Sequence, residues 1–155
     1  MTATLRGEVV AVCVSPKKGM RKNDVGYALL VTGSGLAGDA HAGPGDRQVS
    51  LLADESVNKM RSLGLDVGPG DFAENLTIRG LDLCNLPIGT PLKVGSEVRL
   101  RLTRIGKECH TRCAIYFQAG DCVMPREGVF AEVVHGGEVR SGDPVEVVTD
   151  GEVHE

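Results

Sequence analysis

The sequence is poor in aromatic residues, with no tryptophan, two tyrosines and three phenylalanines among its 155 residues. A core with so few rings must be built from valine, leucine and isoleucine. No apolar stretch reaches the ~18 uncharged residues that a membrane helix needs. Basic residues are not in excess either, because 17 lysines and arginines face 21 acidic residues and leave a net charge of −4. Nucleic acids and anionic membranes favour basic surfaces, so we expect neither as a partner.

A secretory leader is also missing, since residues 1–4 lead directly into a charged, strand-like segment at residues 5–9. The five cysteines are odd in number and unevenly spaced, and three of them fall within residues 109–122. This pattern does not fit the disulfide framework of a small secreted protein. We therefore expect a cytoplasmic protein with reduced thiols, in which Cys13 and Cys84 are small buried hydrophobic residues.

Glycine is abundant, with 21 residues in 155, nearly twice the usual ~7%. Between the glycine and proline turns lie short segments that are rich in β-branched residues or alternate apolar with polar residues. These predicted strands span residues 9–14, 27–31, 48–53, 72–78, 97–105, 129–134 and 145–148. Asp54 is predicted to be the N-cap of a helix that reaches Gly64. Together the elements predict a mainly β fold, closed into a barrel or sandwich to hide the strand edges.

The first candidate site is a polar, glycine-rich segment at residues 35–48. Its glycines would let the backbone approach a ligand and expose N–H groups to an anion. Asp39 and His41 could orient each other or contact a metal, and Arg47 could clamp a phosphate. A solvated loop in which Asp39 caps a turn explains the same spacing, so both interpretations remain open.

The second candidate site is the segment 107–113, in which Cys109 and Cys113 stand four residues apart and Cys122 follows nine residues later. Its basic neighbours favour the thiolate, which is the reactive form of cysteine. In a helix, the first two cysteines would share a face. Three interpretations compete: a sulfane-sulfur carrier with a resolving cysteine, a soft metal site completed by a histidine, or buried structural thiols.

Two further polar segments are interpreted from their neighbours. Glu74 and Asn75 are adjacent in an otherwise apolar stretch, where burial without partners is costly. Either one of them faces a polar cavity, or Glu74 lies on a wet face and Asn75 ends a strand. The basic stretch at residues 17–22 predicts a solvated turn.

Several of these segments occur in one order along the chain. The succession is Gly38-Asp39-Ala40-His41, residues 47–52, residues 70–76, residues 86–90 and a cysteine after a basic turn. It resembles the MOSC domain, which is named for the C-terminal domain of molybdenum cofactor sulfurase, and in particular its small stand-alone bacterial members. The resemblance covers about residues 5–148, so residues 1–155 are expected to form a single MOSC-like domain.

The resemblance implies a mostly antiparallel β-barrel with one or two short helices and a cleft that holds a functional cysteine. In relatives this cysteine carries sulfur as a persulfide or ligates the molybdenum of a molybdopterin cofactor. Cys109 matches the cysteine after the basic turn, whereas Cys113 with Arg112 resembles the family's reductases of N-hydroxylated compounds. Both cysteines therefore remain candidates for the sulfur centre and for the molybdenum ligand.

The other site residues implied by the resemblance share the cleft with that cysteine. Asp39 and His41 are assigned to proton transfer or orientation. The residues assigned to the cofactor are Arg47, Glu74, Asn75 and Arg112, with Arg47 on the anionic pterin phosphate.

The expected function is a molybdenum-cofactor-associated sulfur carrier or molybdopterin-binding module. One alternative is a molybdopterin-dependent reductase of N-hydroxylated compounds, and another is a zinc or iron–sulfur module on Cys109, Cys113 and Cys122. The sequence does not decide whether the protein is an enzyme. If it is one, it is expected to be a sulfurtransferase or a molybdenum-dependent reductase. Expected partners are a cysteine desulfurase or a molybdoenzyme, because the chain leaves no room for a pyridoxal-phosphate domain. The oligomeric state is not indicated.

Overall fold

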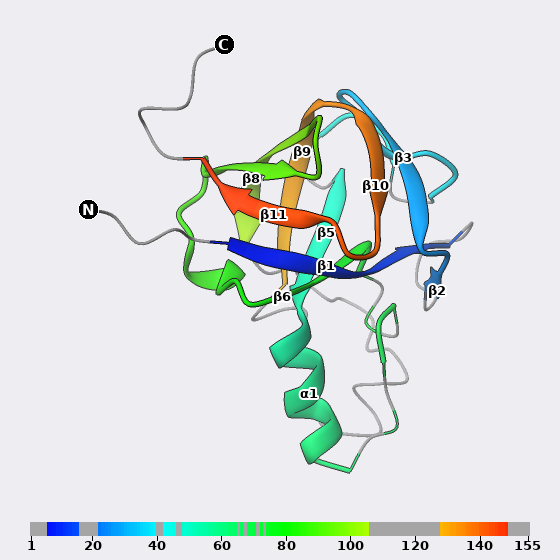
Figure 1. Cartoon of the computed structure of the whole chain (residues 1–155), viewed down its shortest axis with the longest axis vertical. Helices are drawn as coiled ribbons and strands as arrows, with labels where there is room; N and C mark the ends of the chain where they lie inside the picture. The colour runs from blue at the N-terminus through cyan, green and yellow to red at the C-terminus, as the bar shows by residue number, and fades with distance from the viewer. Residues whose placement is uncertain are drawn as a thin grey trace.

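A computed structural model describes residues 6–15, 22–39, 42–45, 48–64, 66, 68–70, 72, 74–105 and 128–148. Within these ranges the structure is mainly β, with a single α-helix that projects from one end of the strands (Figure 1). The strands are β1(Arg6–Val14), β2(Asn23–Asp24), β3(Tyr27–Val31), β4(Gly35–Leu36), β5(Val49–Ala53), β6(Leu76–Arg79), β7(Pro91–Val94), β8(Val98–Ile105), β9(Val129–His135), β10(Gly137–Arg140) and β11(Pro144–Val147). The helices are α1(Asp54–Ser62) and a 3₁₀ turn, η1(Leu83–Asn85).

The principal sheet closes on itself to form a barrel. Its strand order is β11-β7-β8-β9-β5-β6-β1-β2, and an additional pairing of β11 with β1 joins the two sides. The neighbouring strands run antiparallel except for β5 and β6, which are parallel. The structure thus confirms the predicted mainly β, mostly antiparallel barrel with short helices.

A smaller sheet, in the order β10-β3-β4, covers one flank of the barrel. Its longest pairing matches Tyr27 with Arg140 and Leu29 with Glu138, so these four residues stand on the same face. Ala28 and Leu30 point the other way and are buried in the core. Strand β10 begins at Gly137, which pairs with Leu30.

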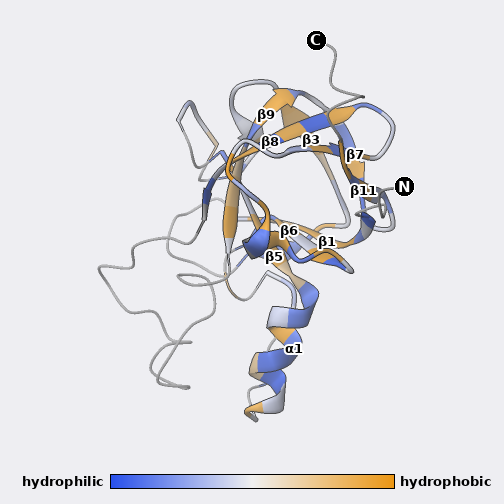
Figure 2. Cartoon of the chain, turned by 90° about the vertical axis from the view of Figure 1, so that its left-hand side faces the viewer, coloured by the Kyte–Doolittle hydropathy of each residue, from blue (hydrophilic) through white to orange (hydrophobic). Residues whose placement is uncertain are grey.

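The core is assembled almost entirely from aliphatic residues, as the shortage of rings requires. Strand β8 shows how the pattern works: Val98, Leu100 and Leu102 are buried while Arg101 is exposed. Figure 2 shows hydrophobic residues distributed along the barrel strands and mostly hydrophilic ones along α1. The described ranges contain no helix with the length and apolarity required to cross a membrane.

Helix α1 begins one residue earlier than predicted. Its N-cap is Ala53, which makes no side-chain capping hydrogen bond, so the prediction of Asp54 as the cap was wrong. Asp54 instead lies in the first turn, where its carboxylate interacts favourably with the positive end of the helix dipole. Val57 and Met60 pack the helix onto the barrel, and Leu63 at its end is exposed.

Candidate functional site

Asp39, the first predicted site residue, is buried in an ion pair with Lys22. The Lys22 Nζ atom lies 2.7 Å from Asp39 Oδ1, and both side chains are 0% exposed. The same oxygen accepts the N–H of Ser15 at 3.1 Å. A buried charge is tolerated when it is paired and hydrogen-bonded, so Asp39 is a fixed carboxylate and not the cap of a solvated loop. The burial of Lys22 corrects the predicted solvated turn for this residue, whereas residues 17–21 lie outside the described ranges.

Glu74 is fully buried at the entrance to β6. Its Oε2 atom accepts the Gly70 N–H at 2.9 Å and the Thr77 hydroxyl at 2.6 Å. Its Oε1 atom has no hydrogen-bond partner within the described ranges. Burial raises the pKa of Glu74 above its ordinary value of 4.5, although Thr77 and the backbone N–H groups of Gly70, Glu74 and Phe72 act to lower that pKa. The interpretation that placed Glu74 on a wet face is therefore excluded.

Asn75 is also fully buried and links three strands. Its Oδ1 atom accepts the backbone N–H and the hydroxyl of Ser50 on β5, at 2.9 Å and 3.1 Å. Its Nδ2 atom donates to the carbonyl of Cys13 on β1 at 3.1 Å. Both ends of the amide are thus used within the protein, immediately before β6 begins at Leu76. Asn75 therefore fixes the start of β6, just after Glu74 in the chain.

Gly70 joins the two halves of the site. Its carbonyl accepts the Lys22 N–H at 2.8 Å, and its N–H binds Glu74. Gly70 has φ +87°, and a Cβ added there would lie 2.2 Å from the Lys22 carbonyl oxygen and 3.2 Å from Cys13 Sγ. Glycine is therefore required at this junction. We call the connected set Lys22, Asp39, Gly70, Glu74, Asn75 and Thr77 the polar cluster.

The remaining predicted site residues lie outside the described ranges. They are His41, Arg47, Cys109, Arg112 and Cys113, together with Cys122. Cys13, by contrast, is buried against the polar cluster, as predicted for a small hydrophobic residue. No group of three or more histidine, cysteine, aspartate or glutamate side chains within the described ranges could hold a metal ion.

The strand register shows where the cysteine-bearing stretch 106–127 joins the barrel. Ile105 pairs with Val129, Val129 with Leu51, and Leu51 with Leu76, which follows Glu74 and Asn75 directly. Adjacent strands are ~4.8 Å apart, so Val129 and Leu76 are separated by roughly 10 Å across the sheet. The residues that flank the stretch, Ile105 and Val129, are therefore in register with Leu51 and Leu76, and Leu76 directly follows the polar-cluster residue Asn75.

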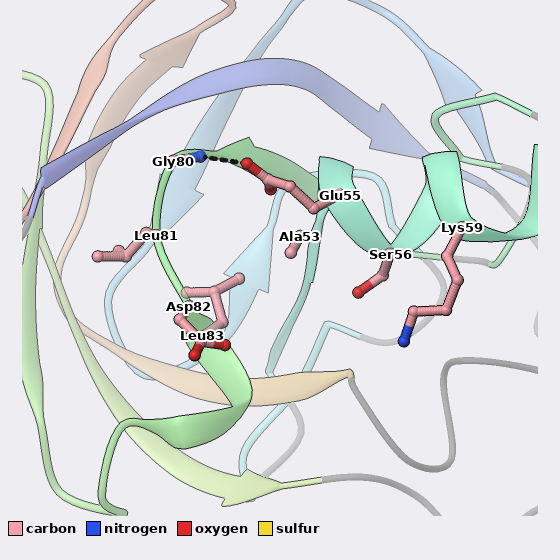
Figure 3. A pocket seen from close by; sticks show the side chains of 8 residues that line it. All are labelled: Ala53, Glu55, Ser56, Lys59, Gly80, Leu81, Asp82 and Leu83. Carbon is pink, nitrogen blue, oxygen red and sulfur yellow. Dashed lines mark hydrogen bonds between the residues drawn. The ribbon is translucent and has the colours of Figure 1, made fainter.

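A surface pocket of about 490 Å³ lies elsewhere, between α1 and the segment Gly80–Leu83. Figure 3 shows Glu55 reaching across to the Gly80 N–H, a 2.9 Å hydrogen bond, while Ser56 and Lys59 extend from the same helix. Its lining contains none of the predicted site residues. Because Gly80 follows the last residue of β6 whereas Glu74 precedes the first, the pocket and the polar cluster stand at opposite ends of that strand.

Sequence reasoning missed Lys22, Ser50 and Thr77. Lys22 stands at the end of a run of basic residues, which is the usual composition of a solvated turn. Thr77 follows Glu74 by three residues. Because buried polar groups are nearly always hydrogen-bonded, its hydroxyl could have been predicted as a donor to the Glu74 carboxyl. Ser50 is 25 residues from its partner Asn75 and carried no local signal.

The comparisons with known proteins come from sequence and from structure. A family model described as MOSC domain matches residues 37–146. No curated protein matches the chain. The YuaD protein of Bacillus subtilis has a similar structure, with a TM-score of 0.78 and 18% identity over 95% of this chain and 98% of that one.

Two YiiM proteins are also similar in structure. The match to YiiM of Geobacillus stearothermophilus has a TM-score of 0.70 and 19% identity, and covers 94% of this chain and 76% of that one. For YiiM of Escherichia coli the TM-score is 0.65 and the identity 23%, over 97% and 72% of the two chains. At such identities the likeness establishes the fold.

Proposed function

Because this chain belongs to the MOSC domain family, we propose that it binds a molybdopterin cofactor and carries sulfur for it on Cys109 or Cys113. Membership confirms the resemblance seen in the ordered motifs and associates the chain with molybdenum-cofactor biology. The observation that carries the proposal is the polar cluster, in which two motif residues far apart in sequence, Asp39 and Glu74, are connected through Lys22 and Gly70.

The described residues fit a polar ligand of this kind. Glu74 Oε1 is buried and lacks a partner within the described ranges, and such atoms are rare unless a ligand or water completes them. The raised pKa of Glu74 favours the neutral acid, which can donate one hydrogen bond to a pterin carbonyl or ring nitrogen. In the proposed site, Arg47 and Arg112 hold the anionic phosphate and Glu74 contacts the pterin.

Asp39 and Asn75 have supporting tasks in this proposal. Asp39 is held in place by Lys22, and in the proposed site it would orient His41, two residues further on. His41 can then hold or release a proton near neutral pH. Asn75 keeps the start of β6 in place so that Glu74 cannot turn away.

When bound, the cofactor supplies a molybdenum centre that a thiolate can ligate. The sulfur step itself uses the chain's own cysteine. Its thiolate attacks the terminal sulfur of a donor persulfide, a new S–S bond forms, and the donor leaves as a thiolate. An acceptor nucleophile later takes the terminal sulfur and restores the cysteine thiolate. The expected cytoplasmic location suits this exchange between reduced thiols.

A sulfur carrier needs one partner that donates the sulfur and another that accepts it. We propose a cysteine desulfurase as the donor and a molybdoenzyme as the acceptor. The register of Ile105 and Val129 supports a cysteine near the polar cluster, because a stretch of 22 residues anchored about 10 Å from Leu76 has ample length to reach it.

The carrier function is tested by intact mass after incubation with a cysteine desulfurase and free cysteine. We expect an adduct of one sulfur atom that thiol reductants remove and that Cys109→Ser or Cys113→Ser abolishes. Cys84→Ser is the matched control and should keep the adduct. Unmodified wild-type protein under these conditions would contradict the carrier function.

A second candidate is a reductase of N-hydroxylated compounds, which Arg112 before Cys113 favours. Here Cys113 would ligate molybdenum and an external reductase would supply electrons. Elemental analysis separates the candidates. Near-stoichiometric molybdenum that is lost in Cys113→Ser favours the reductase, and labile sulfur without molybdenum favours the carrier. Zinc, or a visible cluster absorption, would indicate the module on Cys109, Cys113 and Cys122 instead.

A further inference from the structure

The outer face of β3 exposes apolar side chains that the fold leaves uncovered. Their neighbours in the strand, Ala28 and Leu30, are buried, so the strand presents one face to the core and an equally apolar face to solvent. We call the exposed set the apolar stripe. Its members on β3 and their exposed fractions are Tyr27 (45%), Leu29 (48%) and Val31 (42%), and Val25 (48%) extends it just before the strand begins.

Charged residues border the stripe on β10. Register places Arg140 beside Tyr27 and Glu138 beside Leu29. The Arg140 guanidinium stands 5.6 Å from the Tyr27 ring centre, and the Tyr27 hydroxyl donates to Glu138 at 3.1 Å. Arg140 and Glu138 also pair with each other at 3.1 Å. The border therefore carries one charge of each sign, two residues apart along the strand.

This arrangement is self-complementary, and we propose that the apolar stripe is the interface between two copies of this chain. The symmetry axis would run midway between the two sheets, level with Ala28, perpendicular to β3 and parallel to the sheet. It would bring Tyr27 opposite Leu29 of the second copy and Val31 opposite the chain at Val25. The registry of β10 then places Glu138 opposite Arg140 of the second copy, and the reverse, as an isologous contact requires.

The apolar area suits a standard dimer contact. Four aliphatic and aromatic side chains that are nearly half exposed present on the order of 300–400 Å². A typical interface buries ~800 Å² per partner, of which ~57% is apolar. The stripe thus supplies most of the apolar share, and β10 with its charges supplies the polar rim. Two sheets packed face to face in this way form a sandwich ~10 Å thick.

The first experiment measures mass in solution by sedimentation equilibrium of the full chain. We expect a dimer with a dissociation constant of about 1–100 µM, tightened by salt because each copy has a net charge of −4. Leu29→Glu should weaken association at least ~100-fold, since it buries two unpaired charges. Leu63→Glu, an exposed leucine at the end of α1 on another part of the molecule, should have no effect.

A charge exchange tests the symmetry axis independently of Leu29. Glu138→Arg alone sets arginines against arginines and should weaken association about tenfold. The double variant Glu138→Arg with Arg140→Glu restores opposite charges and should return to within about threefold of the wild type. A wild-type chain that remains monomeric at ~500 µM overturns the proposal. So does a dimer that Leu29→Glu leaves intact, or a double variant no tighter than Glu138→Arg alone.

Discussion

The polar cluster and the apolar stripe both depart from the rule that charged side chains lie at the surface and apolar ones in the core. The cluster buries charges, and the stripe exposes apolar side chains. The cluster places charged side chains at 0% exposure, whereas the stripe leaves Leu29 half exposed on a short strand. The buried charges are paired inside the chain, with a single carboxyl oxygen left over among the described side chains. The exposed apolar side chains of the stripe are not covered by any element that the structure describes. The first region is the one for which we propose a small ligand, and the second is the one for which we propose another protein surface.

The sharpest way to break this comparison is to remove one charge from the cluster. Lys22→Met leaves the Asp39 carboxylate buried without its ammonium partner and should lower the free energy of unfolding by about 3–5 kcal/mol. Urea denaturation measures the loss. Arg79→Met is the control, because Arg79 pairs with Glu8 at 2.9 Å on the surface and should change stability far less. Equal losses in the two variants would show that burial of the pair has no energetic consequence.

A somewhat smaller loss is expected at the junction. Gly70→Ala combines a positive φ with a contact of 2.2 Å to the Lys22 carbonyl, and we expect a loss of about 2–3 kcal/mol. Gly89→Ala is the control, because Gly89 has a similar backbone conformation (φ +94°) and a Cβ added there would have no atom within 4 Å. It should show the cost of the positive φ alone, a loss in the free energy of unfolding of about 1 kcal/mol. If both substitutions cost the same in thermal unfolding, the close packing around Gly70 is not a constraint.

Glu74 offers a pH-dependent test of the same region. Its folded pKa is raised by burial, so the unfolded chain releases this proton at a lower pH than the folded chain. Stability linked to Glu74 is complete below the unfolded pKa and declines as pH rises toward the folded pKa. Glu74→Gln removes this dependence, so the variant should gain stability relative to wild type as pH rises from ~4 to 8. Parallel stability profiles of the two proteins would contradict the buried neutral acid.

The smallest effect is expected on the apolar stripe. Leu29→Ser, studied at low protein concentration, should change the free energy of unfolding by less than ~0.5 kcal/mol, because about half of the side chain is already exposed to solvent. Leu30→Ser, its buried neighbour, provides the contrast and should be strongly destabilising. Urea denaturation that shows a large loss for Leu29→Ser would mean that the stripe stabilises the monomer.

The sequence predicted the barrel better than it predicted the site. Strands with clear alternation, such as β8, and strands rich in valine, such as β1, were found because burial of one or both faces leaves a local pattern. Strands of two to four residues, such as β4 and β10, carry too few residues for any period to show. β6 was placed too early, since residues 72 and 74 are buried without forming part of the strand.

For two of the predicted site residues, Asp39 and Glu74, the structure adds a connection that the sequence did not predict. Asp39 and Glu74 were recognised from motifs, yet the residue that connects them, Lys22, lies 17 residues from its partner and resembles any surface lysine in sequence. For the adjacent pair Glu74 and Asn75 the sequence left two interpretations open: one of them faces a polar cavity, or Glu74 lies on a wet face and Asn75 ends a strand. Both are buried: the Asn75 amide hydrogen-bonds to β5 and β1, and the Glu74 carboxyl accepts the backbone N–H of Gly70.

We propose that the polar cluster belongs to a cofactor site, and the pterin and molybdenum content of the protein tests this proposal most directly. Wild type, Glu74→Gln and Glu74→Ala would be loaded with free molybdopterin cofactor and then freed of excess. The account predicts near-stoichiometric retention by wild type and by the glutamine variant, which can still donate a hydrogen bond. It predicts at least a tenfold loss in Glu74→Ala with unchanged circular dichroism. A wild-type protein that retains neither pterin nor molybdenum would contradict the account.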